Sequence, residues 1–478
     1  ERGIEDHEGA RGRAGATMVL TGWLDRRGDI VQCRLTLVNA SNGATIALRE
    51  FEDRIGNVAV FEDTLAASVL SMLGVATDDR RRGPPGGTTV PAAFEPYIAG
   101  LGLLAQEGSS GEAARHLERA VEADPSFGLA HAALARARWE HCCEEGRYDG
   151  AEQAIESCRT AAQLAPDLAL PHVVLGEIRM QRGQVEEATA SFRKALAVDQ
   201  FSLEGRRGLV DALDAAGDDD MAEEILRRGI AQMPEDWRRH YDLGFFLLMH
   251  GEYDEAVPAL QEVVRRAPRH ESVHSALGAA FFYLERWGDA REAFTRSLDI
   301  RPDYAAYSNL ATLFFQEGRY ADAAEMYEQA LAMDDSDYRV WGNAGAAYLW
   351  LPGQRQRAIE KYRRAAEIAR AACEADPLNA RLQSHLASYY GELGESEKAL
   401  ERVEIAIGLD PDDPEVMFHV GHTYEVLGER DTAIDWIARA IEHGFPRAQI
   451  ERTPGLRALC AEERYYELIE ETEGVELL

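Results

Sequence analysis

One stretch of this sequence has the residue types and spacing of a zinc-protease site. Residues 270–274 read His-Glu-Ser-Val-His. Zinc-protease chemistry needs both histidines one turn apart on a continuous helix, the glutamate as general base, and a third metal ligand. Pro268 ends the preceding helix, so we expect His270 in the turn, a new helix from about Glu271, and His274 at a buried packing position. We interpret the motif as structural and expect no catalytic residue and no metal.

Two other groups of polar residues are weaker candidates for a metal site. His419 and His422 lie three apart on one predicted helix, and we expect no carboxylate or cysteine set to accompany them. Asp218-Asp219-Asp220 follows a predicted turn at Gly217, but it lacks the spaced oxygens of a calcium loop and suits a helix N-terminus. The sequence also lacks a phosphate loop, a nucleophile elbow and a dinucleotide fingerprint. We therefore predict a protein that is not an enzyme and needs no cofactor.

The elements that carry these residues repeat along the chain. An alanine stands twelve residues before a helix-ending turn ten times, and the turns are mostly 34 residues apart, with one spacing of 33 and two of 41 and 42. The alanines are Ala113, Ala154, Ala188, Ala222, Ala256, Ala290, Ala323, Ala365, Ala399 and Ala433. A fixed period of this size predicts stacked helical hairpins. The long spacings predict an insertion near 140–147 and a second helix two turns longer in the eighth repeat.

Small and large residues alternate within each repeat. The eighth position is small, as at Gly176 and Gly278, and the second helix carries a large residue, as at Phe192 and Phe294. Small residues allow two helices to approach closely. This pattern resembles the tetratricopeptide repeat. The resemblance implies an all-α fold, a right-handed superhelix of about ten helical hairpins over residues 94–445, followed by capping helices over 446–478.

The residues before the repeats predict a small α+β unit. Alternating segments at 17–24, 30–38 and 45–51 predict a three-stranded meander, and an amphipathic helix is expected over about 58–73. Gly15-Ala16, Val19-Leu20-Thr21-Gly22, Arg27-Gly28-Asp29, Leu35-Thr36-Leu37-Val38 and Asn42-Gly43 resemble the second half of a TolB-like domain. That resemblance implies the carboxyl-terminal region of a bacterial serine/threonine kinase or adenylate cyclase, and the chain is expected to be part of something longer. We expect a disordered segment over 1–15, the TolB-like fragment over 16–75 and a flexible linker over 76–93.

The charge and hydropathy of the chain exclude several classes of partner. The formal net charge is -33, which argues against nucleic acid and anionic membranes as partners. The sequence has no apolar run long enough to span a membrane. Its scattered cysteines indicate reduced thiols. We expect a cytoplasmic protein, or an extracytoplasmic domain if a membrane span precedes Glu1 in the parent protein.

The first helix of each hairpin is expected to line a concave groove. Its outward positions in the central repeats are apolar or aromatic, and those in the flanking repeats are acidic. The predicted partner-binding residues are Tyr241, Phe245, Leu248, Phe282, Tyr283, Ser308, Asn309, Phe315 and Asn343. Such a groove suits a protein or peptide ligand with hydrophobic anchors and basic flanks. The alternative is that these aromatic side chains pack against neighbouring repeats. Two hypotheses stay open: an interaction scaffold or sensory module, and a regulatory region that controls a kinase or cyclase in cis. An extracytoplasmic assembly factor is a third possibility.

Overall fold

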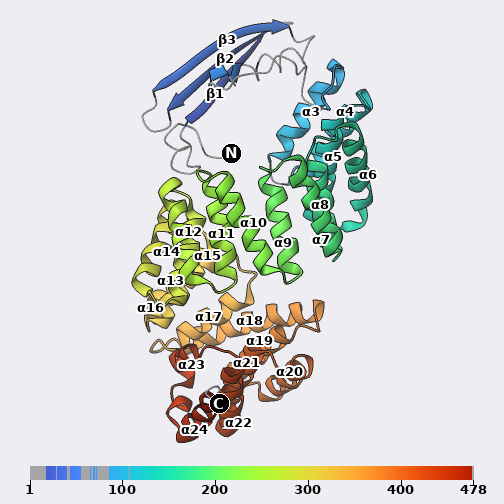
Figure 1. The fold of residues 1–478 in the computed structure, drawn as a ribbon. Helices are drawn as coiled ribbons and strands as arrows, with labels where there is room; N and C mark the ends of the chain where they lie inside the picture. The colour runs from blue at the N-terminus through green and yellow to red at the C-terminus, as the bar shows by residue number, and fades with distance from the viewer. Residues whose placement is uncertain are drawn as a thin grey trace. The chain divides into compact units, whose positions relative to one another are not determined.

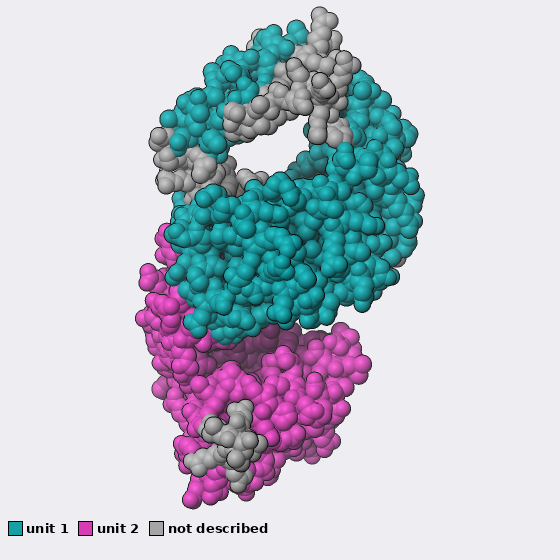
Figure 2. All heavy atoms as spheres, viewed as in Figure 1, with its two compact units in different colours: residues 1–270 teal, residues 271–478 magenta. Residues whose placement is uncertain are grey.

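The chain forms two compact units. The computed structural model describes residues 18–27, 30–39, 44–54, 86–106 and 108–475, together with five isolated positions between 65 and 72. Unit 1 runs from Glu1 to His270 and unit 2 from Glu271 to Leu478 (Figure 2). The segment 1–15 that we expect to be disordered lies outside the described residues.

Unit 1 begins with a three-stranded antiparallel sheet. Strands β1 (Met18–Arg27), β2 (Ile30–Asn39) and β3 (Thr45–Arg54) pair in chain order (Figure 1). Alternate residues of β2 are buried because a strand points successive side chains to opposite faces, and Cys33, Leu35 and Leu37 pack with Met72 and with the partly buried Leu65 and Val69. The meander is therefore confirmed. Val60, Phe61 and Leu73 of the expected helix lie outside the described residues.

Ten antiparallel hairpins follow within the described residues (Figure 1). In unit 1 they are α3 (Pro91–Leu104) with α4 (Ser110–Ala123), α5 (Gly128–Glu145) with α6 (Ala151–Leu164), α7 (Leu170–Gln181) with α8 (Val185–Val198), α9 (Leu203–Ala215) with α10 (Asp219–Gln232), and α11 (Trp237–Met249) with α12 (Tyr253–Arg266). In unit 2 they are α13 (Glu271–Tyr283) with α14 (Trp287–Ile300), α15 (Tyr304–Gln316) with α16 (Tyr320–Met333), α17 (Tyr338–Leu349) with α18 (Arg355–Ala375), α19 (Ala380–Glu392) with α20 (Ser396–Leu409), and α21 (Pro414–Leu427) with α22 (Arg430–Glu442). The all-α repeat fold is confirmed.

Small residues set the distance between the two helices of a hairpin. All ten alanines of the repeat pattern are fully buried, at 0% exposure. A Cβ atom added at Gly176 would lie 2.5 Å from the ring of Phe192, and one added at Gly278 would lie 2.5 Å from the ring of Phe294. The large residue of the second helix therefore occupies the space that the glycine of the first helix leaves. This explains why the two positions are matched within a repeat.

The two long spacings lengthen helices. The first helix of the second hairpin, α5, has 18 residues and is followed by the 3-10 turn η2 (Tyr148–Gly150). The second helix of the eighth hairpin, α18, has 21 residues, whereas its neighbour α20 has 14. Both expected positions are confirmed, since seven additional residues make about two turns.

Most hairpin turns use a glycine in the left-handed conformation. Gly251 has φ 79° and Gly318 has φ 75°. The equivalent position between them, 34 residues after Gly251, is Glu285, which has φ 57° and is the non-glycine residue with positive φ in the described chain. A side chain costs about 1–2 kcal/mol in this conformation. Glu285 is therefore held by its surroundings.

The segment before the first hairpin is more ordered than expected. Helix α3 begins at Pro91, so residues 91–93 of the expected linker are helical. The amide of Leu129 donates to the carbonyl of Gly86 at 3.0 Å, and Thr88 hydrogen-bonds Asp124. Residues 86–90 thus lie against the first two hairpins, and the expectation of a flexible linker is wrong for this part. Residues 76–85 lie outside the described residues.

The last hairpin is covered by a short carboxyl-terminal segment, which we call the cap. It begins at Phe445 and contains α23 (Arg447–Arg452), η3 (Pro454–Leu456), η4 (Leu459–Ala461) and α24 (Glu463–Val475). Its buried residues pack against Ala433, Ile434 and Ile437 of α22: Ile450, Leu456, Leu459, Cys460, Tyr465 and Ile469. The cap removes from water an apolar face that the next hairpin would cover in a longer array.

Candidate functional site

The protease-like motif does not form a catalytic helix. Helix α13 begins at Glu271, so His270 precedes it, as expected. The ring of His270 lies against Trp237 and Tyr241, with ring centroids 4.6 and 5.9 Å apart. His274 is buried at 7% exposure. The expected positions of both histidines are confirmed, and aromatic packing accounts for His270.

The aspartates after Gly217 stand at the start of a helix. Asp218 is the N-cap residue of α10, and Asp219 and Asp220 occupy its first turn. The side chain of Asp218 makes no cap hydrogen bond, and the helix dipole favours carboxylates at this end of α10. Asp219 also lies 3.7 Å from the imidazole of His250.

Three of the nine predicted partner-binding residues belong to unit 1. Tyr241, Phe245 and Leu248 lie on α11, and Phe245 is 45% exposed. The rings of Tyr241 and Phe245 stack with centroids 6.0 Å apart. The pair forms an exposed aromatic patch on one helix.

The other six predicted residues belong to unit 2. Phe282 and Tyr283 meet edge-on at the end of α13, with centroids 5.6 Å apart, and Tyr283 is 58% exposed. Ser308, Asn309 and Phe315 lie on α15 and Asn343 lies on α17. Of these six, Phe315 and Asn343 line a groove. That groove is the strongest candidate site in unit 2.

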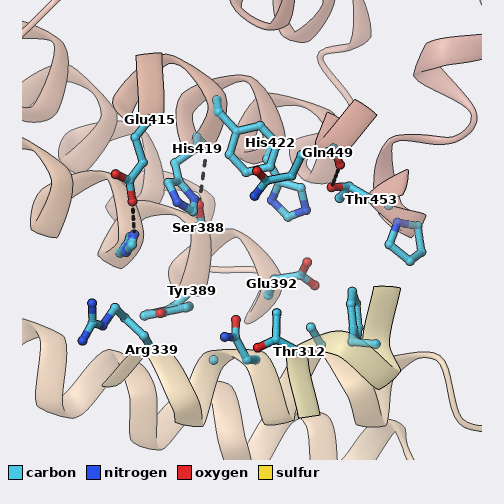
Figure 3. A pocket seen from close by; sticks show the side chains of 18 of the residues that line it. Thr312, Arg339, Ser388, Tyr389, Glu392, Glu415, His419, His422, Gln449 and Thr453 are labelled. Atoms are coloured by element: carbon cyan, nitrogen blue, oxygen red, sulfur yellow. Dashed lines mark hydrogen bonds and ion pairs between the residues drawn. The ribbon is translucent and has the colours of Figure 1, made fainter. Parts of the chain in front are cut away.

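The groove has a volume of about 630 Å³ and is lined mainly by first helices. Its walls come from α15, α17, α19 and α21, with Thr312, Asn343, Ser388 and His422 among the lining residues (Figure 3). Residues of the cap, among them Phe445 and Thr453, complete the wall. We refer to this space as the unit 2 groove. It is formed by four successive repeats and the cap together.

Aromatic side chains give the unit 2 groove its apolar part. Trp350 is 41% exposed and its ring lies 6.2 Å from that of Tyr320. Phe418 stacks on Phe445 of the cap, with centroids 4.4 Å apart and planes 7° apart. These rings offer flat, partly exposed surfaces of the kind that anchor a bound side chain.

Three of the acidic groups predicted at the ends of the groove, Glu204, Glu415 and Glu425, form ion pairs within the chain. Glu415 pairs with Arg381 at 2.8 Å, and Glu425 pairs with Arg430 at 2.5 Å. In unit 1, Glu204 pairs with Arg136 at 2.9 Å. Paired carboxylates attract a cationic ligand less than free ones. The preference for basic flanks therefore rests on the overall net charge.

Glu392 is an exception among these carboxylates. Burial raises its pKa from an ordinary 4.5 to about 7, and the charge of Arg355 opposes this shift only in part. Glu392 lines the unit 2 groove, as do Thr312 and Tyr389 (Figure 3). It is half-protonated near neutral pH and can donate or accept a hydrogen bond there.

Three histidines lie together in the unit 2 groove. Burial lowers the pKa of His385 and of His422 to about 4, and it lowers the pKa of His419 well below 6.5. The rings of His385 and His419 meet edge-on with centroids 4.1 Å apart. Our expectation that no carboxylate accompanies His419 is wrong, because Glu415 stands one turn before it on α21 and lies beside His385.

The sequence contained a signal for this cluster that we did not use. His385 and His419 are 34 residues apart, and both are the sixth residue of a first helix. Asn309 and Asn343 occupy the same position of α15 and α17. Equivalent positions of stacked repeats lie side by side. Extending the column that starts at Asn309 would have placed the two histidines together.

Stacked hairpins of this kind define an α-helical repeat protein. Sequence models described as tetratricopeptide repeat match residues 100–167, 179–243, 271–336, 308–377 and 384–448, which together make up more than half of the chain. The chain belongs to the tetratricopeptide repeat family.

Relatives of this family differ widely in length. The type IV pilus assembly protein PilF of Pseudomonas aeruginosa is 26% identical over 160 residues, which are 33% of this chain and 64% of PilF. Superkiller protein 3 of Schizosaccharomyces pombe is 26% identical over 209 residues, 42% of this chain and 15% of that protein. The wheat (Triticum aestivum) Hsp70-Hsp90 organizing protein is 31% identical over 88 residues, 18% of this chain and 15% of that protein. This chain thus spans less than two thirds of each of these relatives.

Two solved structures match parts of this chain. A structure of Pseudomonas aeruginosa PilF matches with a TM-score of 0.36 and 22% identity, covering 44% of this chain and 92% of that one. The Cut9 and Hcn1 hetero-tetramer matches with a TM-score of 0.42 and 15% identity, covering 86% of this chain and 81% of that one. Among the residues that the structure describes, no helix is long and apolar enough to cross a membrane.

Proposed function

We propose that this chain is a non-catalytic interaction module whose unit 2 groove binds a peptide segment of a protein partner. The observation that carries the proposal is the groove itself, a space of about 630 Å³ lined by four successive first helices. It is large enough for several side chains of a bound segment. An extended or helical peptide with an apolar anchor suits it, because grooves of this kind bind through a few buried contacts.

The lining residues support this proposal. Trp350 and Phe418 offer apolar contacts, while Asn343 and Ser388 offer hydrogen-bonding groups for a peptide backbone. Several relatives are named for protein partners, among them a pilus assembly protein, a chaperone organizing protein and a peroxisomal targeting signal receptor. The shared feature of these names is binding to another protein, and we extend that feature to this chain.

The test is to select peptides from a random library on the purified chain and to titrate a selected peptide by fluorescence anisotropy. Trp350→Ala should weaken binding by more than about 1 kcal/mol, because it removes a partly exposed aromatic anchor. Leu378→Ala is the control, since Leu378 is 76% exposed and does not line the unit 2 groove. Circular dichroism should show the same helix content in both variants.

The proposal would be wrong if Trp350→Ala bound the peptide like the parent chain while Tyr241→Ala or Phe245→Ala abolished binding. That result would move the site to the aromatic patch of α11 in unit 1. Equal effects of Trp350→Ala and Leu378→Ala would also contradict it, since they would indicate non-specific contact with exposed apolar residues.

The bacterial signalling role is a separate proposal. It rests on the resemblance of residues 16–75 to a TolB-like domain and places the chain in the regulatory region of a kinase or cyclase. The cytoplasmic location and the preference for basic flanks are proposals in the same sense. The sequence encoded upstream of Glu1 would test the signalling role and the cytoplasmic location. Peptides with and without flanking lysines would test the preference for basic flanks.

A further inference from the structure

We propose that His385, Glu415 and His419 form a binding site for a divalent transition-metal ion of the zinc type, in the wall of the unit 2 groove. One ligand atom from each of the three side chains can be chosen so that all three atoms lie within 4.8 Å of one another. Two imidazoles and a carboxylate are a donor set that suits zinc and similar ions. The proposal is independent of peptide binding.

The repeat architecture brings the three ligands together. His385 lies on α19. Glu415 and His419 lie one turn apart on α21, the first helix of the next hairpin (Figure 3). Residues four apart share one face of a helix, so Glu415 and His419 both face α19. The site therefore rests on two packed helices and needs no loop to form.

The carboxylate is already oriented toward the imidazole. One oxygen of Glu415, Oε2, forms an ion pair with Nη1 of Arg381 at a distance of 2.8 Å. The other oxygen, Oε1, lies 3.6 Å from Nε2 of His385. Arg381 is itself held by Asp413 at 2.7 Å. Partners of this kind fix the orientation of a ligand carboxylate and leave one oxygen for the metal.

The separation between His385 and Glu415 is close to that of two ligands of one bound ion. Ligand atoms at about 2.0–2.1 Å from one tetrahedral zinc ion are about 3.4 Å from each other. The pair of His385 and Glu415 is within 0.2 Å of that value. The nitrogen of His419 lies within 4.8 Å of the other two ligand atoms.

The ring nitrogens of His385, which lack hydrogen-bond partners among the described residues, are the second observation that indicates a ligand. The residue is 9% exposed, and neither ring nitrogen has a hydrogen-bond partner in the described part of the chain. A buried polar atom without a hydrogen-bond partner destabilises the fold. His250 gives the contrast: it lies near Asp214 and Asp219, but Nδ1 already bonds Phe246 and Nε2 already bonds Asp214. A metal ion would give one ring nitrogen of His385 a partner, whereas both ring nitrogens of His250 already have one.

The test is a zinc titration of the full chain after its metals have been removed with a chelator. Equilibrium dialysis with elemental analysis should give one tightly held Zn²⁺ per chain. Co²⁺ in place of Zn²⁺ should give the visible absorption of a low-symmetry site with nitrogen and oxygen ligands. Zn²⁺ should raise the melting temperature, and Mg²⁺ at the same concentration should not.

The test variants replace each histidine by the residue that other repeats carry at the equivalent position. His385→Asn and His419→Asn introduce the residue that α15 and α17 carry at this position, so the hairpins should fold. Each should weaken zinc binding at least about tenfold, because even a residue that only supports a ligand is worth that much. His250→Asn is the control and should bind zinc like the parent chain.

Three results would overturn the proposal. The first is a parent chain that retains no stoichiometric zinc. The second is a His385→Asn variant that binds zinc as tightly as the parent. The third is loss of binding in His250→Asn, which would place the ion at the exposed cluster of α9 to α11. Peptide affinity should also be measured with and without zinc. This measurement distinguishes failure of the zinc site from failure of the proposed peptide binding.

Discussion

At the scale of single residues, Glu392 makes the stability of the protein depend on pH. Its pKa is raised from 4.5 to about 7 by burial, so the folded chain keeps a proton that the unfolded chain has lost between these two values. The folded state then binds more protons, and the free energy of unfolding falls as pH rises through this range. Above about pH 7 this contribution is constant.

Glu392→Gln should remove this dependence. We expect the variant to gain stability over the parent chain as pH rises from 5 to 8, by at most about 3 kcal/mol. Urea unfolding at several pH values measures the difference, and other titrating groups cancel because both proteins carry them. Glu374→Gln, which removes an exposed carboxylate of α18, is the control variant. A constant difference for Glu392→Gln would show that the residue is ionised in the folded state.

Single residues also show what the sequence could predict. The ten buried alanines and the pairing of Gly278 with Phe294 follow from the period, because each contact joins positions of the same or adjacent repeats. The unused nitrogens of His385 do not follow from it. They depend on the rotation of two side chains in a packed wall, and the pattern of residue types carries no information on that.

At the scale of elements, the separation of the two helices of a hairpin is set by the glycine of the first helix. We expect Gly278→Ala to destabilise unit 2 by about 1–3 kcal/mol, because the new methyl group would meet the ring of Phe294 at 2.5 Å. Gly288→Ala is the matched control in the same hairpin, since a Cβ atom there has nothing within 4 Å. It should leave stability unchanged or raise it by up to about 1 kcal/mol. Chemical denaturation of both variants measures this, and equal effects would contradict the packing argument.

The sequence predicts the lengths of the helices better than it predicts the groove between them. The lengths of α5 and α18 follow from the two long spacings. The unit 2 groove does not, because the cap contributes Phe445 and Thr453 to its wall. How closely the cap approaches α15 and α17 depends on small rotations from one hairpin to the next, which accumulate over several repeats. Sequence spacing does not contain those angles. The nine predicted binding residues therefore included only two from the groove, Phe315 and Asn343.

At the scale of the whole molecule, the division into two units predicts that unfolding is not a single step. Contacts in a repeat array join neighbours, so a local change is felt most by nearby hairpins. Gly278→Ala should reduce hydrogen-exchange protection in α13 to α16 first and leave α5 to α8 unchanged. Its urea transition should be broader than that of the parent, because unit 2 would unfold before unit 1. A uniform loss of protection from α3 to α22 would show instead that the array unfolds as one body.

One contact in unit 2 differs from all this local packing. Arg452 of the cap donates to Glu285 at 2.6 Å across 167 residues, and its guanidinium lies 4.9 Å from the centre of the Trp287 ring. It thereby engages the turn whose residue has the unfavourable positive φ. Proteins with mainly local contacts fold fast, and this distant contact can close only after the hairpins between its ends have stacked. It belongs to the end of folding, so its strength governs how slowly the closed unit opens and has little influence on how quickly the hairpins form.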